Sequence, residues 1–335
     1  MNKNEKSKIE IKNDASICKL IQYEAKRYKS KGLGLIFAWI GAISYFTLIP
    51  NLFKYYWPED IKNPGIFYSL SVYLIFNLTM ILTNLEYFTY YSIEHPFLEK
   101  YKTTPDPWPW KQNINKWNTQ IKKAIKTVFL NTFVLLPVFL IPNIIANESP
   151  YRTDRESMPD MVELLSQIII CMLCEDFFFY LSHRLLHNDY FYKKIHKIHH
   201  EFKETVTISA LYSHPLEFVM GNVVPSSIAP MILGQRMHLI THLVYIMMVL
   251  HESHDGHSGY NFSWSPHRVI PLTFDADFHI FHHWKFKGNY ANYFAIWDKF
   301  FGTVNKTFME YFNNKDEYVK KYLERNSHDI DSKED

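Results

Sequence analysis

Histidine is the residue type whose number and spacing first indicate chemistry in this chain. Only His95 and His328 lie apart from the rest, so 15 of the 17 histidines fall between residues 183 and 283. Histidines that merely face solvent would not gather in this way. Neutral imidazole is the commonest metal ligand in proteins, so this concentration predicts a metal site.

The spacing of these histidines supports the same prediction. Eleven of the 15 fall in four short runs, HRLLH, HKIHH, HESHDGHSGY and HIFHH. Residues three or four apart share one face of a helix, so we expect each run to point two or three ring nitrogens at one place. The ligand candidates from the three regular runs are His183, His187, His196, His199, His200, His279, His282 and His283.

The number of candidate ligands exceeds what a single zinc ion takes, which is about four. Eight histidines, with one or two more from HESHDGHSGY, fit two ions with five or six ligands each. Imidazole suits iron, copper, zinc and nickel alike, so the spacing alone leaves the metal open. The Glu-x-x-His pairs of soluble di-iron bundles are absent at these offsets, and so is the H-E-x-x-H motif of zinc hydrolases. An all-nitrogen site beside apolar segments indicates oxygen chemistry on a lipid.

Other residues of these types favour structural roles. His238 directly precedes the apolar stretch LITHLVYIMMVL and His242 lies in it, and both, like His251, are expected to be structural. His267 follows Ser-Pro and is expected in a loop. The C-x-x-C pair of residues 171–174 lies inside IIICMLC, which favours buried thiols over a zinc or redox site.

Apolar blocks predict membrane helices. Residues 32–53 and 65–85 carry no charge and are long enough to span a bilayer. Two prolines in the block 127–146 predict a broken or shallow helix, residues 161–174 continue the series, and 216–250 is expected to form a hairpin. Lysine and arginine crowd residues 100–126 and 193–203, which places these on the cytosolic side. The expected fold is all-α, with multi-pass membrane helices and a cytosolic helical cap that holds the di-metal site.

The chain resembles the membrane-bound fatty acid hydroxylase and sterol desaturase superfamily, and within it the C-4 methylsterol oxidases. The motifs that carry the resemblance are EDFFFYLSHRLLH, YKKIHKIHHEF, YSHPLE, HSGY, FHIFHH and GNYANYFAIWDKFFGT, with PFLEKYKTTPDPWPW upstream. They occur in the family's order over roughly residues 65–305, which makes the resemblance specific.

The resemblance implies two iron ions, O2, and electrons from NAD(P)H through cytochrome b5 and its reductase. It adds His257 as a ninth ligand and His254 as a tenth, with His214 as a rival for that role or a residue of the substrate path. It implies a multi-pass protein of the endoplasmic reticulum membrane with cytosolic histidine runs. Its substrate is a sterol in contact with membrane lipid, and downstream sterol-processing enzymes are possible partners. No residue beyond the metal ligands is expected to be catalytic. Six flanking carboxylates are candidates to orient imidazole N–H groups or to cap helices: Glu175, Asp176, Glu201, Glu252, Asp275 and Asp277.

Four regions follow from this comparison. We expect a polar cytosolic arm over residues 1–31, membrane helices over 32–160, the fatty acid hydroxylase-type catalytic domain over 161–305, and a charged tail over 306–335. A net charge of +2 gives no sign of a nucleic-acid partner.

One segment departs from the pattern of C-4 methylsterol oxidases. Where they usually have Pro-Phe-Gly and then Ala-Glu-Tyr-Ala-His-Pro, this chain reads TVTISALYSHP. Thr207 and Leu211 in this segment are candidate substrate-binding residues. The change keeps open an oxidation at the sterol side chain (C-24) instead of at the C-4 methyl group. The histidine runs would also suit a sterol desaturase, a fatty acid hydroxylase or a non-catalytic membrane metal-binding protein.

Overall fold

Helices make up all the regular structure of the residues that the structure describes, as the sequence predicts. The computed structural model describes residues 25, 27–273 and 275–331. Within these residues there is no β-strand, and β-type pairing is confined to isolated bridges such as Lys102 with Tyr260 and Arg152 with His238. The predicted all-α class is therefore confirmed. Residues 1–24 and 26 of the predicted polar arm lie outside the described residues.

Five helical segments among the described residues are long and apolar enough to cross a membrane. Their outer faces carry exposed apolar side chains such as Phe37 and Ile145, which are 62% and 80% exposed. A helix suits such an environment because its backbone groups bond to one another and need no water. The five segments are Leu33–Tyr56 (α3), Pro64–Ile93 (α4), Ile114–Ala146 (α7, η1 and α8), Met161–Leu186 (α9) and Pro215–Arg236 (α11, η4, α12 and η5).

The chain divides into two compact units, one formed by the residues up to Leu48 together with Phe262–Thr273 and the other by the rest. In the first unit, the guanidinium of Arg27 donates hydrogen bonds to the carbonyls of Arg268 and Ile270, at 3.0 and 2.8 Å. The Lys31 ammonium donates to the Arg268 carbonyl at 3.2 Å. Two basic residues just before α3 thus donate to carbonyls in and next to the short turn η6 (Pro266–Val269).

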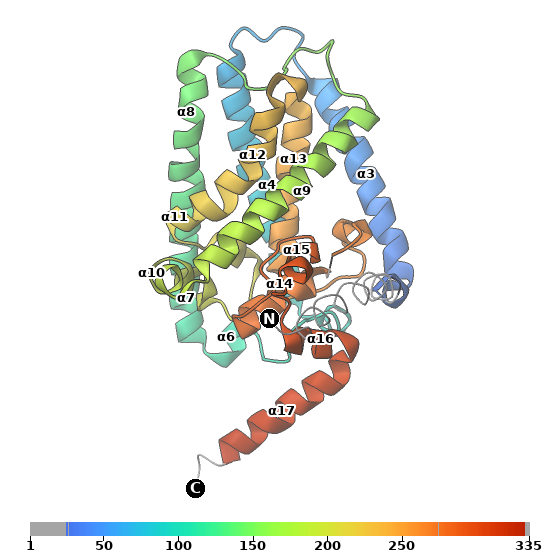
Figure 1. Cartoon of the computed structure of the whole chain (residues 1–335), viewed down its shortest axis with the longest axis vertical. Helices are drawn as coiled ribbons and strands as arrows, with labels where there is room; N and C mark the ends of the chain where they lie inside the picture. The colour runs from blue at the N-terminus through green and yellow to red at the C-terminus, as the bar shows by residue number, and fades with distance from the viewer. Residues whose placement is uncertain (1–24, 26, 274, 332–335) are drawn as a thin grey trace, which may run out of the picture. The chain divides into compact units, whose positions relative to one another are not determined.

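The second unit contains a bundle of long helices. α4 packs against α8 (Leu136–Ala146) and α13 (Leu239–Gly256), while α9 packs against α12 (Val224–Leu233) and α13 (Figure 1). The predicted hairpin is present, because α12 ends at Gly234 with a φ of +50° and α13 returns after the turn η5 (Gly234–Arg236). A positive φ at the reversal suits glycine, which has no Cβ to clash.

The structure corrects the prediction of a broken helix over residues 127–146. It is not broken, because α7 (Ile114–Phe129) continues through a π-helical stretch η1 (Leu130–Leu135) into α8. A π turn adds a residue to the helical ladder, and α8 starts with proline at its first turn and tolerates a second, Pro142, inside it. The segment therefore forms one continuous span of 33 residues.

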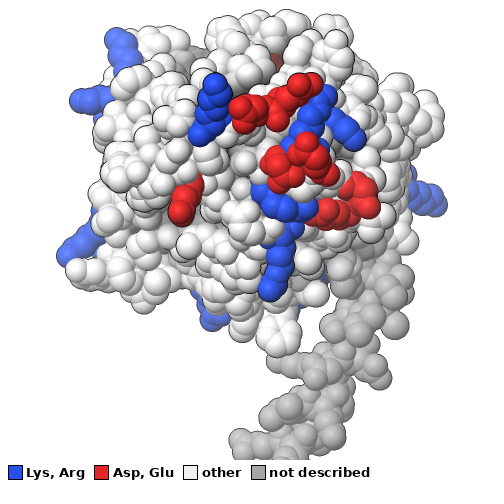
Figure 2. Space-filling model, turned by 90° about the horizontal axis from the view of Figure 1, so that it is seen from above, with Lys and Arg blue, Asp and Glu red and all other residues white. Residues whose placement is uncertain are grey.

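Short elements gather at one end of the bundle and form the cap (Figure 1). They are α5 (Pro96–Glu99), α6 (Pro109–Gln112), α10 (Asp189–Lys194), η2 (His196–Glu201), η3 (Thr207–Leu211), α14 (Asp275–Lys285), α15 (Ile296–Phe300) and α16 (Lys306–Asn313). The longer helix α17 (Lys315–Asp331) extends away from them (Figure 1). Figure 2 looks onto the other end, where acidic and basic side chains lie interspersed. There Arg152, in the connection from α8 to α9, pairs with Glu163 at the start of α9.

Candidate metal centre

Four elements bring the predicted ligands together in the cap. α9 carries His183 in its last turn and is followed directly by His187. The HKIHH run forms the 3-10 helix η2, His257 follows α13, and α14 carries the HIFHH run. Nine histidines meet there in two groups, one of five and one of four. The first group is His183, His187, His196, His200 and His282, and the second is His199, His257, His279 and His283.

Each of the three regular runs sends two histidines to one group, within the expected two or three, and the third histidine of HKIHH and of HIFHH belongs to the other group. HKIHH gives its first and last histidines to the first group and His199 to the second. HIFHH does the reverse, since His279 and His283 belong to the second group and His282 to the first. Adjacent residues on a helix point in very different directions, so the paired histidines in each run separate. The two runs interleave and tie the two groups to each other.

The five imidazoles of the first group face one another through their Nε2 atoms. Neighbouring Nε2 atoms lie 2.9–3.2 Å apart in the pairs His183–His196, His187–His196, His187–His282, His187–His200, His196–His200 and His200–His282. Most of these nitrogens carry a lone pair if the opposite ring nitrogen holds the proton. Lone pairs that converge in a buried site repel one another unless a cation lies among them. The arrangement therefore fits a bound metal ion.

The second group converges in the same way. His257 Nε2 lies 3.3 Å from His199 Nε2 and 3.0 Å from His279 Nε2. The Nε2 of His283 is buried and has no hydrogen-bond partner among the described residues. All four ligand nitrogens lie within 4.8 Å of one another. Four inward-facing nitrogens and an unpartnered one among them fit a second ion.

The opposite nitrogen, Nδ1, is anchored in six of the nine rings. Backbone carbonyls lie 2.7–3.2 Å from the Nδ1 atoms of five of them: Tyr290 for His183, Gly288 for His282, Phe202 for His283, Tyr212 for His199 and Ser253 for His257. A carbonyl only accepts, so each of these Nδ1 atoms carries the proton and leaves Nε2 free as a ligand.

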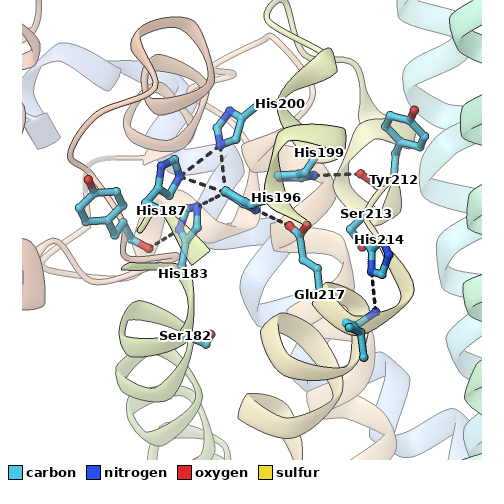
Figure 3. A network of polar contacts seen from close by, with 12 residues as sticks. Ser182, His183, His187, His196, His199, His200, Tyr212, Ser213, His214 and Glu217 are labelled. Carbon is cyan, nitrogen blue, oxygen red and sulfur yellow. Dashed lines mark hydrogen bonds and ion pairs between the residues drawn. The ribbon is translucent and has the colours of Figure 1, made fainter. Parts of the chain in front are cut away.

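A carboxylate anchors the sixth ring. Oε1 of Glu217 lies 2.6 Å from Nδ1 of His196, and Figure 3 shows the carboxylate pointing at that ring. Glu217 is only 5% exposed and sits in the short helix α11 (Pro215–Glu217). It was not among the six carboxylates singled out in the sequence, although it lies three residues after His214 in the motif YSHPLE. That motif was the signal that could have found it.

Three of those six carboxylates hold other parts of the cap. Asp176 accepts the backbone N–H groups of residues 292–294, Asp277 accepts the hydroxyl of Thr103, and Glu201 accepts the hydroxyl of Tyr212. Asp298 adds a second support, because it accepts the N–H groups of Tyr290 and Ala291 at 2.9 and 2.7 Å. The loop 288–294, whose carbonyls orient His183 and His282, is thus fixed by two buried carboxylates.

Burial keeps the ligand imidazoles neutral. It lowers the pKa of His187 to about 2 and that of His199 to about 4. For the other ligand candidates outside the membrane spans, burial holds the pKa well below its usual value: His196, His200, His257, His279, His282 and His283. At neutral pH these rings are therefore available to bind a cation.

Four predicted site residues lie outside the two groups. Nδ1 of His254 lies 2.6 Å from the Leu250 carbonyl, and its Nε2 is buried without a hydrogen-bond partner. His214 accepts the N–H of Leu216 as the N-cap of α11, pointing away from the other histidines (Figure 3). Thr207 bonds to the Tyr91 hydroxyl at 2.9 Å, and Leu211 is buried. Their roles as a ligand or in substrate binding stay predictions.

His238 and His242, which are expected to be structural, make contacts of that kind. His238 caps the start of α13 and lies 3.0 Å from the Asp154 carbonyl. His242 packs against Tyr151, with 4.5 Å between ring centroids. His267 lies in the turn η6, and both cysteines of the C-x-x-C pair are free, with Cys171 buried.

A small cavity borders both metal groups. Its volume is about 20 Å³, enough for a single water-sized molecule. Histidines of both groups line it, namely His183, His196, His199, His257 and His279. A small reactant in this cavity would touch both groups at once.

Comparison with known proteins agrees with this geometry. A model of the fatty acid hydroxylase family matches residues 168–303. The chain is 36% identical to methylsterol monooxygenase 1 of Gallus gallus, over 62% of this chain and 67% of that protein. It is 34% identical to methylsterol monooxygenase 1 of Danio rerio, over 66% and 72%. A very-long-chain aldehyde decarbonylase of Oryza sativa is 35% identical over 44% and 55%. No solved structure matches.

Proposed function

Because the chain belongs to the fatty acid hydroxylase family and has methylsterol monooxygenases among its relatives, we propose that it is a di-iron sterol oxygenase. It oxidises an alkyl group of a sterol, in the first place the C-4 methyl group, toward demethylation. It uses O2 and electrons that come from NAD(P)H through cytochrome b5 and its reductase. The observation that carries this proposal is the pair of buried histidine groups that share one cavity.

Iron fits this donor set better than zinc. Structural and catalytic zinc sites take about four ligands, whereas the first group supplies five nitrogens. Imidazole is a good ligand for iron. Bound iron would supply the activation of O2 that hydroxylation of an unactivated C–H bond needs.

The chain's own residues orient the ligands and exclude water. The carbonyls of Gly288 and Tyr290 and the carboxylate of Glu217 fix which nitrogen of His282, His183 and His196 faces inward. Such partners set ring orientation and raise the basicity of the ligand. Eight of the nine rings are buried and His187 is half-buried, so little water reaches the ligand atoms.

The same proposal extends to the compartment and the partners. Five apolar helices support a membrane protein, and we place it in the endoplasmic reticulum with the cap on the cytosolic side. Lysines of α7 and α10 lie in the cap region, as expected for a cytosolic face. A downstream sterol-processing enzyme would remove the oxidised carbon.

The test is a sterol profile of cells that lack the gene, complemented with wild type, His200→Ala or His95→Ala. His95 is a suitable control because it caps α5 and belongs to neither metal group. We expect 4-methylsterols to accumulate without the gene and with His200→Ala, but not with wild type or His95→Ala. Accumulation of sterols that keep a 24-alkyl group would move the reaction to the side chain. An unchanged sterol profile would refute a sterol substrate and direct attention to acyl lipids and long-chain aldehydes.

A further inference from the structure

An open groove lies on the surface of the cap, between α7 and the segment that follows η2. One part of it has a volume of about 580 Å³ and lies between α6, the start of α7 and residues 201–204. A second part of about 600 Å³ continues along α7 to Lys123. The two parts form one continuous feature, the cap groove, because four residues line both: Asn113, Lys116, Gln120 and Glu201.

The cap groove lies outside the part of α7 that a bilayer core would cover. The uncharged stretch of this span is residues 127–146, which at 1.5 Å per residue extends about 30 Å, the thickness of a bilayer core. The groove residues of α7 are residues 113–123, before this stretch and at the cap end of the helix (Figure 1). A soluble protein domain can therefore reach the groove.

The floor of the groove is bonded to a metal ligand. Phe202 lines the groove and is 1% exposed, and its carbonyl accepts a hydrogen bond from Nδ1 of His283 at 3.2 Å. The half-buried ring of Trp117 lies edge-on to that of Phe202, with 6.3 Å between their centroids. His199 and His200, one from each metal group, directly precede the groove wall. Few bonds therefore separate the surface of the groove from both metal groups.

Lysines on both walls give the groove positive charge. Lys116 and Lys123 come from α7, and Lys203 comes from the segment after η2. All three are exposed. None of them forms an ion pair with another residue that the structure describes. Their charge is therefore available to a partner.

The carboxylates that line the groove are engaged with the cap. Asp106 accepts hydrogen bonds from a buried indole at 3.0 Å and from a tyrosine hydroxyl at 3.1 Å. Glu201 accepts the hydroxyl of Tyr212 at 2.8 Å. Glu204, next to Lys203 in the sequence, is half-buried, and burial raises the pKa of its carboxyl group. The groove therefore presents its lysines to solvent more fully than its acids.

We propose that the cap groove is the docking site of the protein that delivers electrons to the metal centre, and that this carrier presents an acidic surface to the groove lysines. Opposite charges steer such partners together and fix their relative orientation. The inference rests on the proposed oxygenase function and locates the partner that this function requires.

The electron balance sets what docking must achieve. Conversion of a C–H bond and O2 to an alcohol and water consumes two protons and two electrons. Each docking event transfers one electron, so the carrier is oxidised and the metal centre is reduced, and no bond forms between the two proteins. Two carriers must therefore dock and leave for each alcohol formed, which suits a site whose affinity comes from exposed charges.

Purified, iron-loaded full-length protein in nanodiscs of phosphatidylcholine tests the proposal, with the soluble domain of cytochrome b5 as the probe. This lipid has no net charge, so an effect of charge comes from the two proteins. We expect Lys116→Glu/Lys123→Glu to raise the Kd for the probe about tenfold at low salt, because the groove then repels an acidic partner. The difference should shrink at about 0.15 M salt, which screens exposed charges.

A matched pair of lysines controls for general charge effects. Lys193 and Lys194 of α10 are also exposed but line neither part of the groove. Lys193→Glu/Lys194→Glu makes the same change in charge and should leave the Kd within about twofold of wild type, as expected for charges outside the contact. Lys203→Gln, on the opposite groove wall, should raise the Kd about threefold. All variants should keep the wild-type metal content, which mass spectrometry measures.

Reoxidation of the reduced probe, followed by its absorbance, separates docking from electron transfer. In Lys116→Glu/Lys123→Glu the probe concentration at half-maximal rate should rise about as much as the Kd, while the maximal rate stays within about twofold of wild type. A merely structural role of these lysines would instead lower the metal content or the maximal rate.

The outcomes are distinguishable. An unchanged Kd in the groove variants, or an equal loss of affinity in the α10 pair, would overturn this docking site. Binding that requires an anionic lipid in the nanodisc and ignores the groove lysines would also overturn it, because the probe would then dock on the membrane surface. Sterol oxidation with a chemical reductant by protein that never binds the probe would overturn this inference alone. Probe binding at the groove without oxidation of any sterol would overturn the proposed function and leave the docking site standing.

Discussion

The runs HKIHH and HIFHH each contribute histidines to both metal groups. The group to which a histidine belongs therefore predicts which metal ion is lost when that histidine is substituted. His200 points its Nε2 into the first group, 3.0 Å from His196 and 3.2 Å from His282. His254, only three residues before a ligand, keeps its Nε2 outside both groups. The spacing in the sequence does not distinguish His200 from His254, because both lie within three residues of histidines that belong to the two groups.

We expect His200→Ala to lower the metal content of the purified protein by about one ion per chain, since the first group loses a central ligand. His254→Ala should retain the wild-type metal content, because no nitrogen of His254 reaches either group. Elemental analysis of protein purified without added metal checks both. Equal losses of metal in the two variants would show that His254 is the tenth ligand after all.

Burial of neutral histidines predicts how the metal-free protein responds to acid. Burial lowers the pKa of His199 and His254 to about 4 each, while an unfolded histidine takes up its proton near pH 6.5. Between these values the unfolded chain binds more protons than the folded one, so the free energy of unfolding falls as the pH falls.

We therefore expect the melting temperature of the metal-free protein in detergent to drop as the pH is lowered from 7 to 5. Bound metal should reduce this drop, because a ligand nitrogen that holds a metal cannot take a proton. Differential scanning fluorimetry at several pH values measures both curves. A melting temperature of the metal-free protein that stays constant over this range would contradict the assignment of neutral buried imidazoles.

Among the elements, the sequence predicted the helices better than their details. The apolar blocks in the sequence predicted where the membrane helices lie. The helix predicted from residues 65–85 is α4 (Pro64–Ile93), which continues beyond the apolar block into more polar residues. The π-helical stretch η1 was not predictable, because proline signals a break and the compensating change in the hydrogen-bond ladder has no sequence pattern of its own. The role of Glu217 depends on a contact with His196, 21 residues earlier in the sequence. The role of Asp298 depends on the course of the loop before it, whose N–H groups at Tyr290 and Ala291 it accepts.

The loop 288–294 is the element on which the first metal group most depends. Asp298 accepts two of its N–H groups, and carbonyls of the loop orient His183 and His282. We expect Asp298→Asn to weaken this support by about 1–3 kcal/mol, because a charged acceptor of two N–H groups is replaced by a neutral one.

The expected result is selective loss of metal from the first group, with about one ion per chain retained, since the second group has no ligand anchored by this loop. Metal content and thermal stability should be measured together, with Glu310→Gln in α16 as a surface control. Loss of both ions, or of neither, would show that the loop does not act through the first group.

At the scale of the whole molecule, the continuous span of α7, η1 and α8 fixes which parts of the chain lie on opposite sides of a membrane. It has 33 residues, and at 1.5 Å per residue a helix of this length extends about 50 Å, more than the roughly 30 Å of a bilayer core. Lys123 in α7 and Glu156 in the connection from α8 to α9 are both exposed. They should therefore face opposite compartments.

Single cysteines introduced as Lys123→Cys and Glu156→Cys, in a chain whose three native cysteines are replaced by serine or alanine, test this arrangement. In sealed endoplasmic reticulum vesicles with the cytosolic side outward, a membrane-impermeant maleimide should label residue 123 at once and residue 156 only after detergent is added. Both positions should label equally in detergent, which controls for reactivity. Labelling of residue 156 in intact vesicles would make this span re-entrant. Labelling of residue 156 and protection of residue 123 would place the cap, and with it the histidine groups, in the lumen, where a cytosolic electron donor could not reach them.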